Sequence, residues 1–179
     1  MAPIRVLVNG ATGKMGTETV SAVCREEDLT LVGATCHTAR GSSLPLPDGS
    51  SVPLSTNLEK LLHETTPDVL VDFTNATASM EASLMAAGRS VNLVLGASGL
   101  TDDNLRQLDA VANDNNIGVI VAPNFALGAV VLKKLVEQAV EYFDYVDIVE
   151  SHHEAKIDAP SGFAMALAQS IGDKKQFTR

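Results

Sequence analysis

Short runs of valine, isoleucine and leucine recur along the first 122 residues, and amphipathic segments separate them. This alternation is typical of strands buried in a parallel sheet and joined by crossover helices. The pattern predicts strands at residues 4–9, 29–36, 68–73, 91–96 and 117–122. It predicts helices at residues 15–25, 58–64, 78–87 and 102–113, the last with Thr101 as its N-cap. Residues 41–54 contain three prolines and no periodicity, and are predicted to form a loop at the sheet edge.

The character of the chain changes beyond residue 122. Apolar residues recur there at spacings of three and four, which predicts a long amphipathic helix from Leu127 to near Asp144. A strand is predicted at residues 145–151, followed by a polar segment and a short helix at residues 163–171. We therefore expect an α/β fold in two parts. A parallel-sheet domain occupies residues 1–122, and a smaller, incomplete α+β region occupies residues 123–179.

Composition narrows the possible classes of function. The chain has 179 residues, of which 45% are hydrophobic, and its formal net charge is −9. A chain of this size forms a substantial core, but its acidic balance argues against a nucleic-acid partner. No apolar run is long enough to span a membrane and no targeting pattern opens the sequence, so we expect a cytoplasmic protein. Cys24 and Cys36 fit neither a disulfide framework nor a metal site.

A glycine-rich turn follows the first predicted strand and precedes the first predicted helix. Gly10, Gly13 and Gly16 are spaced Gly-x-x-Gly-x-x-Gly, with Lys14 and Met15 between the last two. Glycines at such a turn let the backbone approach a pyrophosphate, and the helix N-terminus offers unpaired N–H groups to the anion. The position at the start of a βαβ series favours a Rossmann-type NAD(P)-binding domain over a purely structural turn.

The end of the second predicted strand indicates which dinucleotide is preferred. An Asp or Glu there would bind a free 2′-hydroxyl on the adenosine ribose, but residues 35–40, Thr-Cys-His-Thr-Ala-Arg, contain no acid. Lys14 and Arg40 are cations that can pair with a 2′-phosphate instead. We therefore predict NADPH rather than NADH as the cofactor. The alternative is that both cations only solvate surface turns.

A second polar segment, residues 150–162, concentrates groups that transfer protons and hold anions. A histidine can donate a proton near neutral pH, and a lysine nearby can hold an anion or stabilise developing negative charge. Ser161 and the glycine after it precede an apolar helical run, so their backbone N–H groups can bind a carboxylate. On the pattern alone, an ordinary polar turn with a capped helix explains the segment equally well. A metal site is not expected, because His152 and His153 are adjacent and point apart in an extended chain.

The two segments together resemble the dihydrodipicolinate reductase family, also called the 4-hydroxy-tetrahydrodipicolinate reductases. The matching motifs are VNGATGKMG at 8–16, VDFTNATA at 71–78, LGASG at 95–99, APNFALG at 122–128 and ESHHEAKIDAPSG at 150–162. The resemblance implies a nicotinamide-binding Rossmann domain, a smaller substrate-binding and oligomerisation region, and a homotetramer. The implied activity is NAD(P)H-dependent reduction of a dicarboxylate, 4-hydroxy-tetrahydrodipicolinate, to tetrahydrodipicolinate in diaminopimelate and lysine biosynthesis.

The resemblance also implies roles for individual residues. It places the cofactor at the glycine turn and at the ends of later strands, where open α/β sheets bind ligands. The residues concerned are Gly10, Gly13, Lys14, Met15, Gly16, Asp72, Phe73, Thr74, Gly96, Ser98, Asn124 and Phe125. His152 is implied as the acid, and Lys156 as the group that assists protonation. Substrate binding is implied for His153, Lys156, Ser161, Gly162 and Phe163.

Three features depart from the family pattern. Phe163 stands where the family has threonine, which removes a hydroxyl but keeps the backbone N–H. The family's Gly-Thr-Thr-Gly is Gly-Ala-Ser-Gly at residues 96–99, and family members continue well beyond the position of Arg179. Two alternatives therefore stay open: a non-catalytic NADPH-binding module, and a related reductase with a different substrate.

Overall fold

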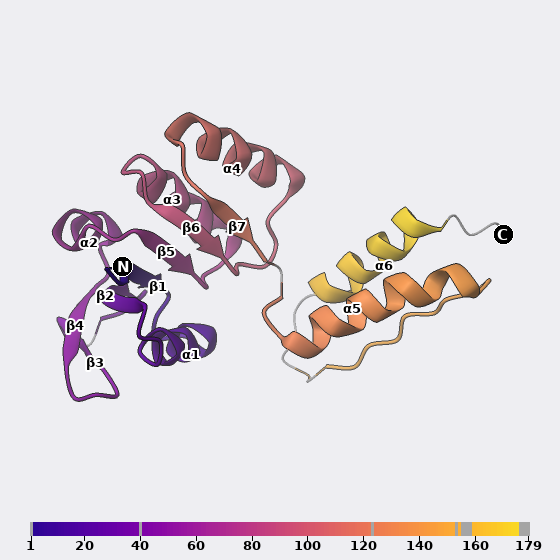
Figure 1. Cartoon of the computed structure of the whole chain (residues 1–179), viewed down its shortest axis with the longest axis horizontal. Coiled ribbons are helices and arrows are strands. Elements are labelled where there is room, and N and C mark those ends of the chain that lie inside the picture. The colour runs from indigo at the N-terminus through magenta and orange to yellow at the C-terminus, as the bar shows by residue number, and fades with distance from the viewer. Residues whose placement is uncertain (1, 40, 123, 153, 155–158, 176–179) are drawn as a thin grey trace. The chain divides into compact units, whose positions relative to one another are not determined.

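The computed structural model describes residues 2–39, 41–122, 124–152, 154 and 159–175. The chain divides into two compact units, residues 1–122 and residues 123–179, which appear in Figure 1 from indigo to yellow. The first unit is built on one seven-stranded sheet, and the described part of the second contains paired helices.

The sheet of the first unit is mostly parallel. Its strands are β1 (Ile4–Asn9), β2 (Leu29–Thr35), β3 (Ser43–Pro45), β4 (Ser51–Ser55), β5 (Val69–Asp72), β6 (Asn92–Leu95) and β7 (Val119–Val121). Their spatial order is β3-β4-β2-β1-β5-β6-β7, and β3 pairs antiparallel with β4. The predicted parallel α/β fold is confirmed. The order of the strands reverses between β1 and β5, which is the switch point where sheets of this kind bind ligands.

Helices lie on both faces of this sheet. They are α1 (Lys14–Val23), α2 (Leu58–Thr65), α3 (Ala76–Ala87) and α4 (Asp102–Asn115). Strand β1 divides the core, because Val6 and Val8 join one buried cluster and Leu7 joins the other. Helix α1 contributes to the first cluster, whereas α2, α3 and α4 contribute to the second. Burial on both faces explains why the strand sequences are continuously apolar.

The helix starts follow local sequence signals. Thr101 accepts a hydrogen bond from the backbone N–H of Asn104, and the Asn104 side chain accepts one from the backbone N–H of Thr101. This reciprocal pair confirms the predicted N-cap. Asn57 and Asn75 cap α2 and α3 through their side-chain oxygens. Each cap satisfies a helix N–H group that has no partner within the helix.

The loop predicted at residues 41–54 is wrong, because β3 and β4 form a hairpin there. Gly49 adopts a φ of +84° at the turn, and the Asp48 carboxylate accepts a hydrogen bond from the backbone N–H of Ser50 at 2.9 Å. Val52 of β4 is buried in the core cluster that contains α1. The prolines did not prevent strand formation, since Pro45 lies in β3, at the edge of the sheet.

The second unit is described by its own helices: α5 (Leu127–Ala139), the 3₁₀ helix η1 (Val140–Tyr142) and α6 (Gly162–Lys174). Val140, Leu167 and Ile171 form the buried contact between them. The Ser170 hydroxyl donates a hydrogen bond to the Glu137 carboxylate and holds the pKa of that carboxyl below its ordinary value. The predicted helices at 127–144 and 163–171 are therefore confirmed, with small differences at their ends.

The strand predicted at residues 145–151 is wrong. All seven residues are described, and none of them joins a strand ladder. Val149 is 92% exposed and Tyr145 is 87% exposed. An apolar run forms a strand only where a neighbouring strand pairs with its backbone groups, and no strand lies in the described part of the second unit.

Candidate functional site

The glycine turn begins where β1 leaves the sheet. Gly10 has a φ of +79°, a conformation that side chains with a Cβ rarely adopt. A Cβ at this position would lie 3.0 Å from Thr74 Cγ2 and 3.2 Å from the carbonyl oxygen of Phe73. The turn therefore packs directly against the residues that follow β5, and only glycine fits without displacing them.

The start of α1 is held close to the same turn. A Cβ on Gly16 would lie 2.1 Å from the Gly10 carbonyl oxygen and 2.7 Å from the Cα of Ala11. Gly13, the N-cap, offers no side chain to the first helical turn, which contains no acidic residue. The backbone N–H groups of Lys14, Met15 and Gly16 have no acceptor among the described residues. These features provide an anion-binding N-terminus that a pyrophosphate can approach closely.

A buried polar network lies beneath this turn. Asp72, the last residue of β5, has no exposed surface. One carboxylate oxygen accepts a hydrogen bond from the Asn9 side-chain amide, and Asn9 in turn accepts one from the Thr35 hydroxyl. The other carboxylate oxygen accepts hydrogen bonds from the Thr74 backbone N–H at 2.9 Å and from its hydroxyl at 2.8 Å. The ends of β2, β1 and β5 are thus tied together at one level.

Two further predicted residues follow the next strand. The backbone N–H of Gly96 donates to the Asp72 carbonyl oxygen at 2.8 Å, and Ser98 forms an isolated parallel bridge with Asn75. The backbone N–H of Phe73 donates a hydrogen bond to the backbone carbonyl oxygen of Asn9 at 3.2 Å. The structure therefore gathers the predicted residues after β1, β5 and β6 at the carboxyl edge of the sheet. Because Asp72 is fully buried and hydrogen-bonded to Asn9 and Thr74, its side chain holds the carboxyl edge of the sheet in position.

Sequence reasoning missed Asn9 and Thr35 as members of this network. A signal was present, because both are polar residues at the ends of apolar strands, as Asp72 is. Their pairing depends on strand order, since 26 residues separate Asn9 from Thr35 and 63 separate Asn9 from Asp72.

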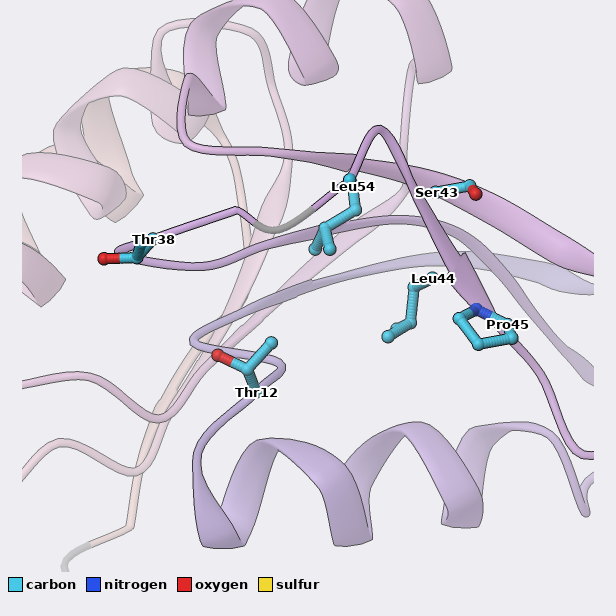
Figure 2. A pocket seen from close by; sticks show the side chains of 7 residues that line it. Thr12, Thr38, Ser43, Leu44, Pro45 and Leu54 are labelled. Atoms are coloured by element: carbon cyan, nitrogen blue, oxygen red, sulfur yellow. The ribbon is translucent and has the colours of Figure 1, made fainter.

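A pocket of about 680 Å³ lies beside the glycine turn. It is lined by Thr12, Thr38, Gly41, Ser43, Leu44, Pro45 and Leu54, and Figure 2 shows six of these side chains around it. Thr12 belongs to the glycine turn, Thr38 follows β2, and the remaining residues come from or border the β3–β4 hairpin. The pocket thus lies at the end of β2, where the adenosine ribose is expected. Arg40, predicted to bind a 2′-phosphate, lies outside the described residues.

The second unit carries the candidate proton donor. His152 is exposed, and its Nδ1 lies 3.9 Å from the Oε2 atom of Glu150. Glu150 also accepts hydrogen bonds from the backbone N–H and the hydroxyl of Ser161, which is the N-cap of α6. His153 and Lys156, two of the residues predicted to bind substrate, lie outside the described residues.

The N-terminus of α6 resembles that of α1 in the backbone donors of its first turn. The backbone N–H groups of Gly162 and Phe163 have no acceptor among the described residues. The Phe163 side chain is half-buried and packs against the cluster of Val140, Leu167 and Ile171. Its contribution at the surface is therefore a backbone donor, while its ring stabilises the helix pair.

The start of α5 carries two more predicted residues. Asn124 accepts a hydrogen bond from the backbone N–H of Ala126 at 2.8 Å, and Phe125 is 44% exposed. Their contact with a cofactor stays a prediction.

Within the described ranges, no group of three or more His, Cys, Asp or Glu residues is placed to hold a metal ion. No helix in the described part of the chain has the length and apolar character of a membrane span.

The strand order and the glycine turn define a Rossmann-type dinucleotide-binding fold. Solved structures of this class superpose on the chain even at low sequence identity. GenD2 from gentamicin A biosynthesis, solved in complex with NAD, has a TM-score of 0.65 at 20% identity, covering 78% of this chain and 40% of its own. At that identity the likeness shows the fold alone.

Sequence comparison resolves the particular family. Residues 4–125 match the family described as dihydrodipicolinate reductase, N-terminus, and residues 128–179 match dihydrodipicolinate reductase, C-terminus. The chain belongs to the dihydrodipicolinate reductase family, which confirms the resemblance inferred from its motifs.

Individual relatives agree over nearly the whole chain. The 4-hydroxy-tetrahydrodipicolinate reductase of Dehalococcoides mccartyi is 46% identical over 172 residues, covering 96% of this chain and 65% of the relative. The dipicolinate-bound dihydrodipicolinate reductase from Paenisporosarcina sp. TG-14 has a TM-score of 0.80 and 39% identity, covering 96% of this chain and 66% of its own. The chain therefore spans about two thirds of the length of these relatives.

Replacing Gly16 with alanine tests the close approach in the glycine turn. The added Cβ collides with the backbone of Gly10, so Gly16→Ala is expected to lower the free energy of unfolding by about 1–3 kcal/mol. Urea denaturation measures this loss, and NADPH fluorescence titration is expected to show weaker binding. Gly88→Ala is the control, because its Cβ would make only ordinary contact, 3.6 Å from the Leu84 carbonyl oxygen. Equal behaviour of the two variants would contradict the packing argument.

Replacing Asp72 with alanine tests the buried network. The substitution leaves the Asn9 amide and the Thr74 donors without their acceptor, and is expected to cost about 3 kcal/mol of unfolding free energy. Urea denaturation again provides the measurement. Asp109→Ala, on the exposed face of α4, is the matched control and is expected to change stability by less than about 0.5 kcal/mol. A loss at Asp72 no larger than that of the control would rule out the network as a stabilising element.

Proposed function

We propose that the first unit binds a nicotinamide dinucleotide with its pyrophosphate at the glycine turn. The observation that carries this proposal is a tightly packed turn that admits no Cβ at Gly10 or Gly16, next to three N–H groups at the start of α1 that have no acceptor among the described residues. Backbone can approach an anion closely there, and the dipole of α1 favours negative charge. When bound, the reduced cofactor would supply a hydride to the substrate.

The pocket beside the turn would hold the adenosine half of the cofactor. Thr12, Thr38 and Ser43 bring hydroxyl groups to its wall, and Leu44 and Leu54 provide apolar contact for a base. No acid occurs at residues 35–40, so no carboxylate repels a 2′-phosphate there. Lys14 is exposed at the first position of α1, and Arg40 follows β2 in the sequence. These features favour NADPH, with NADH as the alternative.

The second unit would bind the substrate and supply a proton. We assign the proton to His152, substrate binding to His153, and both charge stabilisation and substrate binding to Lys156. The backbone donors at the start of α6, from Gly162 and Phe163, would hold a carboxylate. Membership of the reductase family supports 4-hydroxy-tetrahydrodipicolinate, an intermediate of lysine and diaminopimelate biosynthesis, as the substrate. The Paenisporosarcina relative, solved with dipicolinate bound, supports a dicarboxylate.

The cofactor contacts assigned to the strand ends and to Asn124 and Phe125 belong to the same proposal. Residues 1–122 would form the NAD(P)-binding domain, and residues 123–179 would contribute to substrate binding and oligomerisation.

The exposed apolar side chains of α5, among them Leu127, Val131 and Leu135, support a homo-oligomer. We place the reaction in the cytoplasm.

One observation favours a second candidate function. Phe163 replaces the threonine of the family pattern, and its ring packs into the helix pair, so the position offers no side-chain hydroxyl to a substrate. A reductase with a different substrate would show NADPH oxidation only with another imine or aldehyde. A non-catalytic module would bind NADPH without turnover of any such compound.

Replacing His152 with alanine tests the proton donor. Turnover of 4-hydroxy-tetrahydrodipicolinate, followed by loss of NADPH absorbance, is expected to fall by about 10²–10⁴-fold because the acid is missing. The dissociation constant of NADPH is expected to stay unchanged, since His152 lies outside the glycine turn. His63→Ala, an exposed histidine on α2, is the control and should retain full turnover. Wild-type turnover in the His152 variant would remove this residue from the mechanism.

Replacing Lys14 with alanine tests the cofactor preference. The NADPH dissociation constant is expected to rise about five- to tenfold, equivalent to about 1 kcal/mol for one charge-assisted contact. The NADH constant is expected to change less, because NADH has no 2′-phosphate. Lys60→Ala, which removes an exposed lysine on α2, is the control. Tenfold preference of the wild type for NADH would contradict the prediction, and equal weakening of both cofactors would assign Lys14 to the pyrophosphate instead.

A further inference from the structure

We infer that Glu150 is a positioning residue for His152. Its carboxylate holds the Nδ1 side of the imidazole and thereby makes Nε2 the nitrogen that exchanges a proton with the substrate. This inference rests on the proposed function for the identity of the reaction, but the arrangement itself is defined within the second unit. It concerns a residue that touches neither substrate nor cofactor in the proposal above.

The Glu150 carboxylate is anchored at the start of α6. Oε1 accepts a hydrogen bond from the Ser161 backbone N–H at 2.7 Å, and Oε2 accepts one from the Ser161 hydroxyl. Ser161 is only 5% exposed, and its hydroxyl oxygen also accepts the backbone N–H of Ala164 at 3.1 Å. One serine therefore connects the carboxylate to the first turn of the helix. Two hydrogen bonds to the same residue fix both the position and the plane of the carboxylate.

His152 lies on the side of this carboxylate that carries Oε2. The distance of 3.9 Å from Nδ1 to Oε2 is too long for a hydrogen bond but short enough for an electrostatic contact. A negative charge beside Nδ1 favours the tautomer of the neutral ring that carries its proton on that nitrogen. Once His152 has delivered a proton from Nε2, the remaining Nδ1–H faces Glu150. The same geometry orients the ring, as carboxylates do for histidines in other sites.

The substitution Glu150→Gln reverses this preference with little change in shape. The glutamine carbonyl oxygen would take the place of Oε1 and accept the Ser161 backbone N–H. Its NH₂ group would then take the place of Oε2, facing Nδ1 as a donor. A donor at that place stabilises the unprotonated Nδ1, so the neutral imidazole is expected to shift to the Nε2–H tautomer.

The tautomer is measured by long-range ¹H–¹⁵N correlation spectra of the labelled full chain, with His152 identified by its absence in His152→Gln. In spectra of the neutral ring, the wild type is expected to show mainly Nδ1–H, and Glu150→Gln mainly Nε2–H. Glu154→Gln removes an exposed carboxylate from the same segment and is expected to leave the tautomer unchanged. A wild-type Nε2–H tautomer, or the same tautomer in wild type and Glu150→Gln, would overturn the inference.

Two further readouts separate positioning from a purely structural role. Ser161→Ala removes one hydrogen bond to Glu150 but keeps its charge and the backbone N–H contact, so Nδ1–H is expected to persist. In turnover assays, Glu150→Gln is expected to lower kcat about tenfold or more while the KM for NADPH stays unchanged. The spectra require neither turnover nor cofactor. An inactive chain with the Nδ1–H tautomer would therefore count against the proposed function and not against this inference.

Discussion

The Asp72 carboxylate has no exposed surface, so the hydrogen bonds it accepts must come from the protein. Asn9 and Thr74 provide them, and Thr35 extends the network to a third strand. Three strand ends are thereby fixed at one level, at the edge of the sheet from which the glycine turn begins. The shape of the candidate dinucleotide site depends on this constraint, because the turn packs against Thr74 without space for a side chain at Gly10. A site held by strand ends is more precise than one held by loops alone.

The second unit repeats this design at a helix N-terminus. A carboxylate, that of Glu150, is again satisfied by a hydroxyl and a backbone N–H, both from Ser161. Each unit also has a helix start, that of α1 in the first and that of α6 in the second, where backbone N–H groups have no acceptor among the described residues. The carboxylates fix the geometry, and the N–H groups remain available to anions. Helix N–H groups of this kind suit a net-acidic chain, which must attract negatively charged molecules locally.

Local signals explain what could be predicted from the sequence. The glycine turn, the Thr101 cap and the apolar strands depend on residues close together in the chain, and the structure contains each of them. The failures involve pairing between distant segments. Residues 41–54 form strands, and Val52 of this segment packs into the core cluster that contains α1. Residues 145–151 form no strand, because no other strand lies beside them in the described part of their unit. The pocket lined by Thr38 and Leu44 depends on the hairpin at residues 41–54, so it could not be predicted from local sequence signals either.

The bond between Glu150 and Ser161 joins residues that are eleven positions apart. A stretch fastened at both ends loses little conformational freedom when its interior sequence changes, because closure is already provided by its base. Glu150 and Ser161 thereby hold the start of α6 in place, so the residues proposed for chemistry between them, such as His152 and Lys156, are not needed to place the helix.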